Sequence, residues 1–215
     1  MINTNIKCSD SFKNYLNNIN TNTKKLYNIA SKARKIGFDS EDEVEIKLAE
    51  NMAERVVGII SVIAPQIINS GVLKRIIELE KKYGVLDWRV AFIIAHEISE
   101  QKFCKFKNNI EAIEIGIKTG FAYVTVGVVS SPIEGLTSIE IKKRRDNLGE
   151  YFKLNYAGPI RNAGGTMAAV SVLIADYVRQ KLGYLKFDPD EFEIKRCYAE
   201  LEDYHKYVAN LQYQE

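Results

Sequence analysis

The sequence contains few of the residues from which disulfide frameworks and metal sites are built. Its 215 residues include three cysteines and two histidines, and no pair of cysteines has the C-x-x-C spacing of a zinc site. An odd number of widely separated cysteines also argues against a disulfide framework, so a reducing cytoplasm is the expected setting. At His96 the run HEISE has Glu100 where a zinc protease needs a second histidine, and we interpret His96 and His205 as structural or surface residues.

Long apolar segments and an excess of one charge are also lacking. The most hydrophobic run, residues 56–72, is interrupted by Pro65, Gln66 and Asn69. We therefore expect neither a signal peptide nor a membrane span, and no membrane as a partner. Lysine and arginine total 30 against 28 aspartates and glutamates, for a net charge of +2. Because this is close to balance, any surface that binds nucleic acid must come from local clustering of charge.

No arrangement of side chains typical of a catalytic centre is evident. There is no Ser-His-Asp arrangement and no G-x-S-x-G turn. The acidic groups at residues 41–43 and 202–203 lack the glycine-flanked loop that would hold two metal ions about 4 Å apart. We therefore predict no catalytic residue, no metal ligand and no cofactor in this chain, and we expect it to act as a binding module.

Helical periodicity dominates most of the chain. A polar helix that ends near Gly37 is predicted within residues 1–40, which are expected to form a unit of their own. Asp87 is expected to cap a helix, and Pro189 is expected at the first position of the last helix. Residues 41–215 are predicted to form one compact domain. It is expected to contain a short strand at 42–47 and helices at 48–63, 72–83, 88–102, 110–131, 167–183 and 189–211.

Between residues 132 and 156 the pattern changes from helical to alternating. Residues 136–141 (LTSIEI) and 151–156 (YFKLNY) alternate apolar and polar side chains. The polar run KKRRDNLG between them has the glycine of a hairpin tip. We therefore predict a two-stranded antiparallel element. Together with the helices it gives an α+β fold class that is predominantly helical and contains a small antiparallel β-hairpin.

A glycine-rich segment, YAGPIRNAGGT, leads directly into a predicted helix and is the first candidate site. Glycines let a backbone approach a ligand closely, and free N–H groups at a helix start attract anions. An arginine within the segment would add a bidentate partner for phosphate. The spacing matches neither a Walker A loop nor G-x-G-x-x-G. Two interpretations stay open, a polyanion contact and a simple tight turn with Thr166 as N-cap. The candidate residues are Gly158, Arg161, Asn162, Gly164, Gly165 and Thr166.

The second candidate is the densest run of positive charge, at the predicted hairpin tip. It consists of Lys142, Lys143, Arg144 and Arg145, which are called the basic tip below. Four cations on one hairpin can contact several DNA phosphates, since a duplex carries about one negative charge per 1.7 Å of its axis. The alternative is a solvated turn that aids solubility. The tip and the glycine-rich segment leave opposite ends of one predicted strand, so they can share a ligand only if it is long.

The glycine-rich segment and its helix resemble a known family. YAGPIRNAGGTMAAVSVLIADYVRQKLG is similar to the AGPIRSAGGT segment, and the helix after it, in the large subunit of archaeal family D DNA polymerase, with Asn162 where serine is usual. Residues 43–60, 121–143 and 204–213 resemble the same family in the same order. Members of that family are much longer, and their catalytic aspartates are expected outside these 215 residues. The resemblance therefore implies an N-terminal fragment, or one piece of a split subunit.

The resemblance implies template-directed DNA synthesis by a heterodimer, with magnesium at the large subunit and proofreading by a 3′–5′ exonuclease small subunit. For this chain it implies no catalysis in isolation. The implied partners are primer-template DNA, the small exonuclease subunit and the remaining domains of the large subunit. Residues 157–166 and the basic tip are the expected DNA contacts. The alternative is a purely architectural module, whose glycine-rich turn packs against later domains or the small subunit without contacting DNA.

Overall fold

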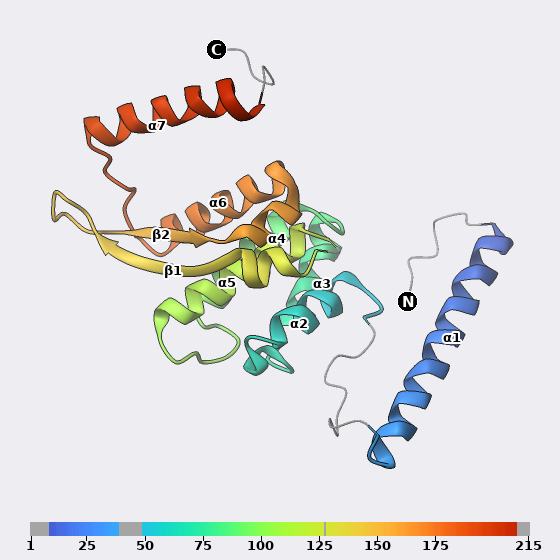
Figure 1. The fold of residues 1–215 in the computed structure, drawn as a ribbon. Coiled ribbons are helices and arrows are strands. Elements are labelled where there is room, and N and C mark those ends of the chain that lie inside the picture. Colours follow the sequence, from blue (N-terminus) through green and yellow to red (C-terminus); the bar gives the residue numbers. More distant parts are fainter. Residues whose placement is uncertain (1–8, 39–48, 127, 210–215) are drawn as a thin grey trace. The chain divides into compact units, whose positions relative to one another are not determined.

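The structure is a computed structural model that describes residues 9–38, 49–126 and 128–209 (Figure 1). The chain divides into two units, Met1–Lys47 and Leu48–Glu215. The first unit contains helix α1 (Asp10–Lys35). The second contains α2 (Met52–Ser61), α3 (Val72–Tyr83), α4 (Trp88–Ser99), α5 (Asn109–Val124), β1 (Leu136–Lys143), β2 (Glu150–Tyr156), α6 (Gly164–Lys181) and α7 (Glu191–Tyr204), with the short helical turns η1 (Pro65–Ile67), η2 (Ser131–Gly135), η3 (Gly158–Ala163) and η4 (His205–Ala209). This arrangement of many helices with an antiparallel hairpin confirms the predicted fold class.

Helix α1 begins and ends at residues that favour helix termini. Ser9 caps its start by accepting a hydrogen bond from the Phe12 N–H at 3.3 Å. Gly37 has a φ of +79°, and its N–H donates to the Arg34 carbonyl at 3.0 Å. The predicted end near Gly37 is therefore confirmed. The strand predicted at residues 42–47 lies outside the described residues.

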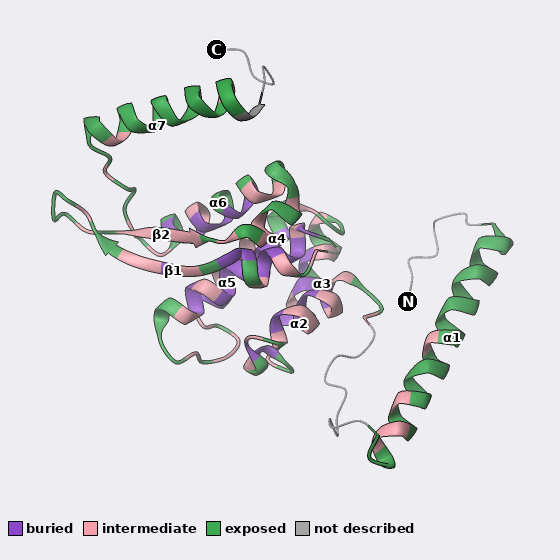
Figure 2. Ribbon diagram, in the orientation of Figure 1, coloured by how far each residue is buried: buried purple, intermediate pink, exposed green. Residues whose placement is uncertain are grey.

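Helix α5 forms the centre of the hydrophobic core of the second unit. From Ala112 to Tyr123 every residue except Glu114 is buried, which explains why the helix is apolar on nearly every side. Helices α2, α4 and α6 and strand β1 pack around it. Figure 2 shows the buried residues concentrated on α5 and on parts of the neighbouring helices.

Two glycines bring α4 and α5 into very close contact. A Cβ added at Gly116 would lie 2.3 Å from the Ser99 Oγ and 2.4 Å from the Ala95 carbonyl oxygen. A Cβ added at Gly120 would lie 2.7 Å from the Ala91 carbonyl oxygen. Because the three facing residues of α4 are also small, the two helices can pack almost backbone to backbone. Any larger side chain at either glycine would push the helices apart.

The structure corrects the predicted end of α5. The sequence predicts one helix as far as Pro132, but α5 ends at Val124. The N–H and the hydroxyl of Thr125 both donate to the Phe121 carbonyl, at 3.0 and 2.7 Å. The chain then passes through the π-helical turn η2 before it enters β1. The run FAYVTVGVV contains no periodic signal at which to end the helix, because a buried helix is apolar on all sides.

The start of α7 is corrected as well. Pro189 does not occupy the first helical position, because Asp190 is the N-cap and the helix begins at Glu191. The Asp190 carboxylate accepts from the Glu193 N–H at 2.8 Å, and the Glu193 carboxylate accepts from the Asp190 N–H at 3.2 Å. These two reciprocal hydrogen bonds form a capping box, which satisfies two N–H donors at the helix start.

The predicted hairpin is confirmed, and its strands are longer than expected. β1 and β2 pair antiparallel, with Lys143 opposite Glu150 at the end nearest the tip. The strands therefore include Lys142 as well as Lys143, and the connecting turn is limited to residues 144–149. Ile139 is buried, and β1 packs against α5. The hairpin thus rests on the core through one of its faces.

Gly120→Ala is expected to destabilise the second unit, because the added methyl group would meet the Ala91 carbonyl oxygen at 2.7 Å. Overpacking of this kind lowers the free energy of unfolding by about 1–3 kcal/mol, which urea denaturation followed by circular dichroism measures. The matched control is Gly165→Ala in α6, where an added Cβ has no atom within 4 Å. This change should raise stability by up to about 1 kcal/mol. Equal effects of the two substitutions would contradict the close α4–α5 contact.

Candidate functional site

The glycine-rich segment folds as a short 3-10 helix, η3, that continues directly into α6. Pro159 lies at the start of η3, and Gly164, with a φ of +77°, provides the sharp change of direction at which α6 begins. The interpretation of Thr166 as N-cap is therefore wrong. Ala163 occupies the cap position, and no side chain caps the helix. The Gly164 N–H donates to the Arg161 carbonyl, and no side chain caps the N–H groups that follow it in the first turn of α6.

The back of this segment is fixed against η2. The Ser131 hydroxyl donates to the Pro159 carbonyl at 2.9 Å, and the Asn162 amide donates to the Ser130 hydroxyl at 2.9 Å. Gly135 permits the contact, since a Cβ there would lie 2.7 Å from the backbone of η3. Asn162 is thus held from within the chain. Sequence reasoning missed these partners, for which the sequence offers no signal beyond the two adjacent serines of SSPIEG.

The front of the segment is open. A Cβ added at Gly158, Gly164 or Gly165 would meet no atom within 4 Å. Arg161 is exposed, and within the described residues its guanidinium has no hydrogen bond and no ion pair. The segment therefore presents bare backbone and one unpaired planar cation on a surface that is held rigidly from behind.

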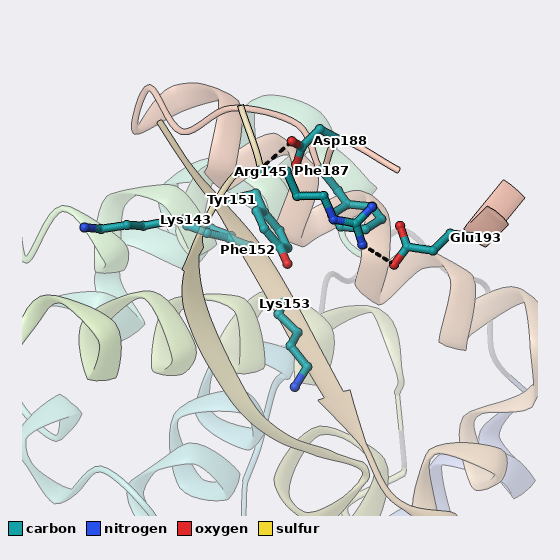
Figure 3. A pocket seen from close by; sticks show the side chains of 8 residues that line it. All are labelled: Lys143, Arg145, Tyr151, Phe152, Lys153, Phe187, Asp188 and Glu193. Carbon is teal, nitrogen blue, oxygen red and sulfur yellow. Dashed lines mark hydrogen bonds and ion pairs between the residues drawn. The ribbon is translucent and has the colours of Figure 1, made fainter. Parts of the chain in front are cut away.

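Arg145 joins the hairpin tip to the segment that leads into α7. Its guanidinium forms ion pairs with Asp190 at 2.7 Å and with Glu193 at 2.8 Å. Its backbone N–H donates to the Asp188 carboxylate at 2.8 Å, and the Asp146 N–H donates to the same oxygen at 3.2 Å. Figure 3 shows Arg145 between the hairpin and this segment. Sequence reasoning missed these contacts, because the three aspartate and glutamate partners beyond α6 lie far from Arg145 along the chain.

The other three cations of the basic tip differ in their surroundings. Arg144 donates to the Asp146 carboxylate at 3.0 Å and to a backbone carbonyl of the segment before α7. Lys142 lies 2.6 Å from the Glu140 carboxylate. Hydrogen bonds from Lys142 hold the pKa of Glu140 at about 2, and those from Arg144 hold the pKa of Asp146 at about 2. Lys143 alone among these cations has no partner within the described chain.

A cleft of about 420 Å³ lies between β2 and the segment before α7 (Figure 3). Tyr151 and Lys153 line it from β2, and Phe187 and Asp188 line it from the opposite segment. The rings of Tyr151 and Phe187 are in contact, with 5.0 Å between their centroids. Two acids and three cations line the cleft together. It therefore carries both signs of charge and is not a purely basic surface.

The two candidate surfaces lie at opposite ends of β2. The turn that contains Arg144 and Arg145 precedes this strand, and η3 with Arg161 follows it. A strand of seven residues spans about 20 Å. The structure therefore does not bring the two surfaces into one site, and only an extended ligand can reach both.

The histidine motif on α4 is a packed structural feature. The His96 Nε2 lies 3.4 Å from the Glu100 carboxylate, and its ring meets the Tyr177 ring edge to face. Burial lowers the pKa of His96. In the ranges that the structure describes, no group of three or more histidine, cysteine, aspartate and glutamate side chains could hold a metal ion. Within the same ranges, no helix is both long enough and apolar enough to cross a membrane.

Comparison with known proteins gives a consistent match. The family model described as DNA polymerase II large subunit DP2, N-terminal, matches residues 14–215. The DNA polymerase II large subunit of Nanoarchaeum equitans is 49% identical over 189 residues, which are 88% of this chain and 15% of that protein. The large subunit of Methanococcus maripaludis strain C5 is 39% identical, over 97% of this chain and 18% of its own length. The large subunit of Pyrococcus abyssi is 45% identical, over 88% of this chain and 12% of its own length. The chain thus spans less than a fifth of each of these relatives.

Arg145→Ser is expected to release the segment before α7 from the hairpin tip, because it removes the ion pairs to Asp190 and Glu193. Amide hydrogen exchange over residues 185–193, read by mass spectrometry, should become faster. The free energy of unfolding should change little, since the pairs are exposed. Lys143→Ser removes a neighbouring cation without breaking these pairs and should leave the exchange unchanged. Identical exchange in the two variants would show that Arg145 does not anchor the segment.

Proposed function

The chain belongs to the DNA polymerase II large subunit family, whose N-terminal part it matches, and we propose that it contributes DNA backbone contact and assembly to an archaeal replicative DNA polymerase. The catalytic carboxylates, and the magnesium ions that they bind, then belong to parts of the polymerase outside these 215 residues. The chain acts together with primer-template DNA, the remaining domains of the large subunit and a small exonuclease subunit. In isolation it does not polymerise.

Arg161 is the residue that carries the proposed DNA contact. Its guanidinium is exposed and unpaired within the described residues, whereas Arg75 and Arg145 pair with carboxylates of their own chain. A phosphate accepts two parallel hydrogen bonds from a guanidinium, and it also accepts from the free N–H groups at the start of a helix. Both kinds of donor are present between Arg161 and the first turn of α6. This combination supports a backbone phosphate as the ligand.

The glycines beside Arg161 support a close approach by that ligand. Gly158 and Gly165 do not have positive φ values, and a Cβ at either position would meet no atom of the described chain within 4 Å. Neither backbone conformation nor internal packing therefore requires the absence of a side chain at these two positions. A DNA backbone lying against the segment would require it, because each added methyl group would stand between the phosphate and the peptide N–H groups.

The same observations fit a second function, packing of the segment against another part of the polymerase. A protein backbone can approach bare glycines as closely as DNA can, and Arg161 can pair with a carboxylate there. In that case the contact would contribute to assembly and not to DNA affinity. A substitution that keeps the charge but removes the planar fork of the guanidinium separates these two functions.

The basic tip has a smaller part in the proposed DNA contact than its sequence suggests. Lys143 is the tip residue best placed to contact a phosphate, because it has no partner within the described chain. Lys142, Arg144 and Arg145 are engaged with carboxylates. Exposed ion pairs of this kind are weak, so these three residues are proposed as secondary contacts that exchange a carboxylate for a phosphate.

Arg161→Lys is expected to weaken the binding of primer-template DNA by the complete polymerase. Loss of the bidentate contact costs about 1–3 kcal/mol, which corresponds to about 5–150-fold in the dissociation constant. The melting temperature should not change, because the side chain is exposed and has no partner among the described residues. Fluorescence anisotropy and thermal unfolding measure the two quantities, with Arg196→Lys on α7 as the control. Weaker assembly or a lower melting temperature at unchanged DNA affinity would favour the packing function instead.

Gly165→Ala is expected to raise the stability of the chain and to weaken its binding to DNA. The methyl group should stabilise α6, since an added Cβ meets no atom within 4 Å. It should nevertheless weaken DNA binding at least severalfold, because it covers the backbone that the phosphate approaches. Filter binding and thermal unfolding of the same preparation measure both effects. Full DNA affinity in this variant would argue against a backbone phosphate at this position.

The isolated chain is expected to extend no primer in the presence of magnesium and all four deoxynucleotides. The product should stay at the level of a reaction without protein, while the complete polymerase serves as the positive control. Metal-dependent synthesis by the chain alone would refute the assignment of the catalytic carboxylates to other parts of the polymerase.

A further inference from the structure

Helix α7 has large apolar side chains that are exposed in the part of the chain that the structure describes. None of its 14 residues is buried, and in Figure 2 it is exposed along nearly all of its length. Ile194, Tyr198, Leu201 and Tyr204 are 57%, 60%, 69% and 51% exposed. A helix of fewer than about 15 residues is marginal in water without tertiary packing. The helix therefore gains stability from any partner that covers these side chains.

The four side chains form one continuous stripe along α7. They follow one another at spacings of four, three and three positions, which places neighbours within about 60° of each other around the helix axis. This spacing is typical of a helix face that packs against a second helix. Phe192 lies on the opposite side of α7 and does not belong to the stripe.

Glutamates border the stripe on both sides. With about 100° of rotation per residue, Glu193 and Glu200 lie along one border and Glu191 and Glu202 along the other. The sequence EFEIKRCYAELEDY contains five acidic and two basic residues, an excess of three negative charges. Glu193 and Glu200 form ion pairs in this chain, but these pairs are exposed and can be exchanged for others. A partner that covers the stripe therefore meets acidic borders.

The start of α7 is positioned before any partner arrives. The capping box of Asp190 and Glu193 fixes its first turn, and Arg145 ties both residues to the hairpin tip. Because the first turn is already ordered, a partner has less conformational entropy to remove on binding.

We propose that α7 is a docking helix for a basic amphipathic helix from another part of the same polymerase large subunit. Lysine and arginine beside an apolar seam would pair with the glutamates at both borders, as charged residues do beside the seam of a coiled coil. DNA and anionic membranes are disfavoured by these glutamates, and so is the α7 helix of a second copy, which carries the same charges.

The length of the relatives supports a partner helix from outside these 215 residues. The matched segments are 12% to 18% of the relatives' lengths. Most of each related large subunit therefore has no counterpart in these 215 residues. The inference rests on the proposed function only in placing the chain within the polymerase. It does not depend on whether Arg161 contacts DNA.

Hydrogen exchange tests the docking directly, by comparing the chain alone with the complete polymerase in the absence of DNA. Amides of residues 194–204 are expected to exchange at least tenfold more slowly in the polymerase. Leu201→Asp should abolish this protection, because it places a charge in the centre of the stripe. Arg196→Ser, on the opposite side of α7, is the matched control and should leave the protection intact. Absence of slowing in the unmodified polymerase would overturn the proposal.

Carbodiimide cross-linking of the same polymerase identifies the occupant. The reagent joins a carboxylate to an amine as an amide with loss of water, so Glu191 and Glu202 should link to lysines of a helical segment elsewhere in the large subunit. Glu202→Gln should remove the links of that residue. Links to the small subunit or to a second copy, or protection that appears only when DNA is added, would contradict the assigned occupant.

The two proposals can fail separately. Leu201→Asp should leave the DNA affinity of the isolated chain unchanged within twofold, since the stripe is not part of the proposed DNA contact. If Arg161→Lys retains full affinity while α7 remains protected, the DNA contact is wrong and the docking stands. If α7 is unprotected while Arg161→Lys loses affinity, the docking is wrong and the DNA contact stands.

Discussion

The close contact between α4 and α5 is the constraint on which the second unit depends. Gly116 and Gly120 present no side chain toward α4, so α5 approaches the small residues of that helix and keeps its other sides free to pack against α2, α6 and β1. Gly120 also sets the distance to α6, because a Cβ there would lie 3.2 Å from the Ile174 side chain. Since the glycine-rich segment continues directly into α6, the position of Arg161 in η3 depends on packing near the middle of α6.

Buried polar groups add contacts of defined geometry to the apolar packing of this core. The Tyr123 hydroxyl donates to Glu80 on α3 and accepts from the Leu86 N–H before α4, both at 2.9 Å. Burial raises the pKa of this hydroxyl, so it keeps the proton that it donates. Lys118, whose side chain is nearly inaccessible, pairs with Glu114 at 2.7 Å on the face of α5 near β1. Removing Glu80 would leave the buried Tyr123 hydroxyl without this acceptor, so the contact favours one packing of α3 against α5.

Local signals in the sequence were sufficient for most of the fold, and the errors arose where the signal was nonlocal or missing. Asp87 was correctly predicted as a cap, because a capping residue acts on N–H groups two or three positions away. The α5 boundary was wrong, since an apolar run has no period from which an end can be read. The prediction of Thr166 as N-cap was wrong, because α6 begins where the backbone turns at Gly164, which has a positive φ, and not at a polar capping side chain. The pairing of Arg145 with Asp190 could not be predicted, because only the folded chain brings them together.

Charge that is dense in the sequence is not the same as charge that is available to a ligand. The basic tip contains four cations in succession, but in the fold most of them meet carboxylates, and the tip becomes the anchor for the segment that leads into α7. Arg161 is an isolated charge that stays available to a ligand. No other charged residue lies between Lys153 and Asp176. No acid nearby in the sequence can neutralise it, and the packing of η3 against η2 fixes the segment that carries it. An isolated cation on a rigid surface thus retains its full charge for an external anion, and this is the physical reason to rank it above the tip.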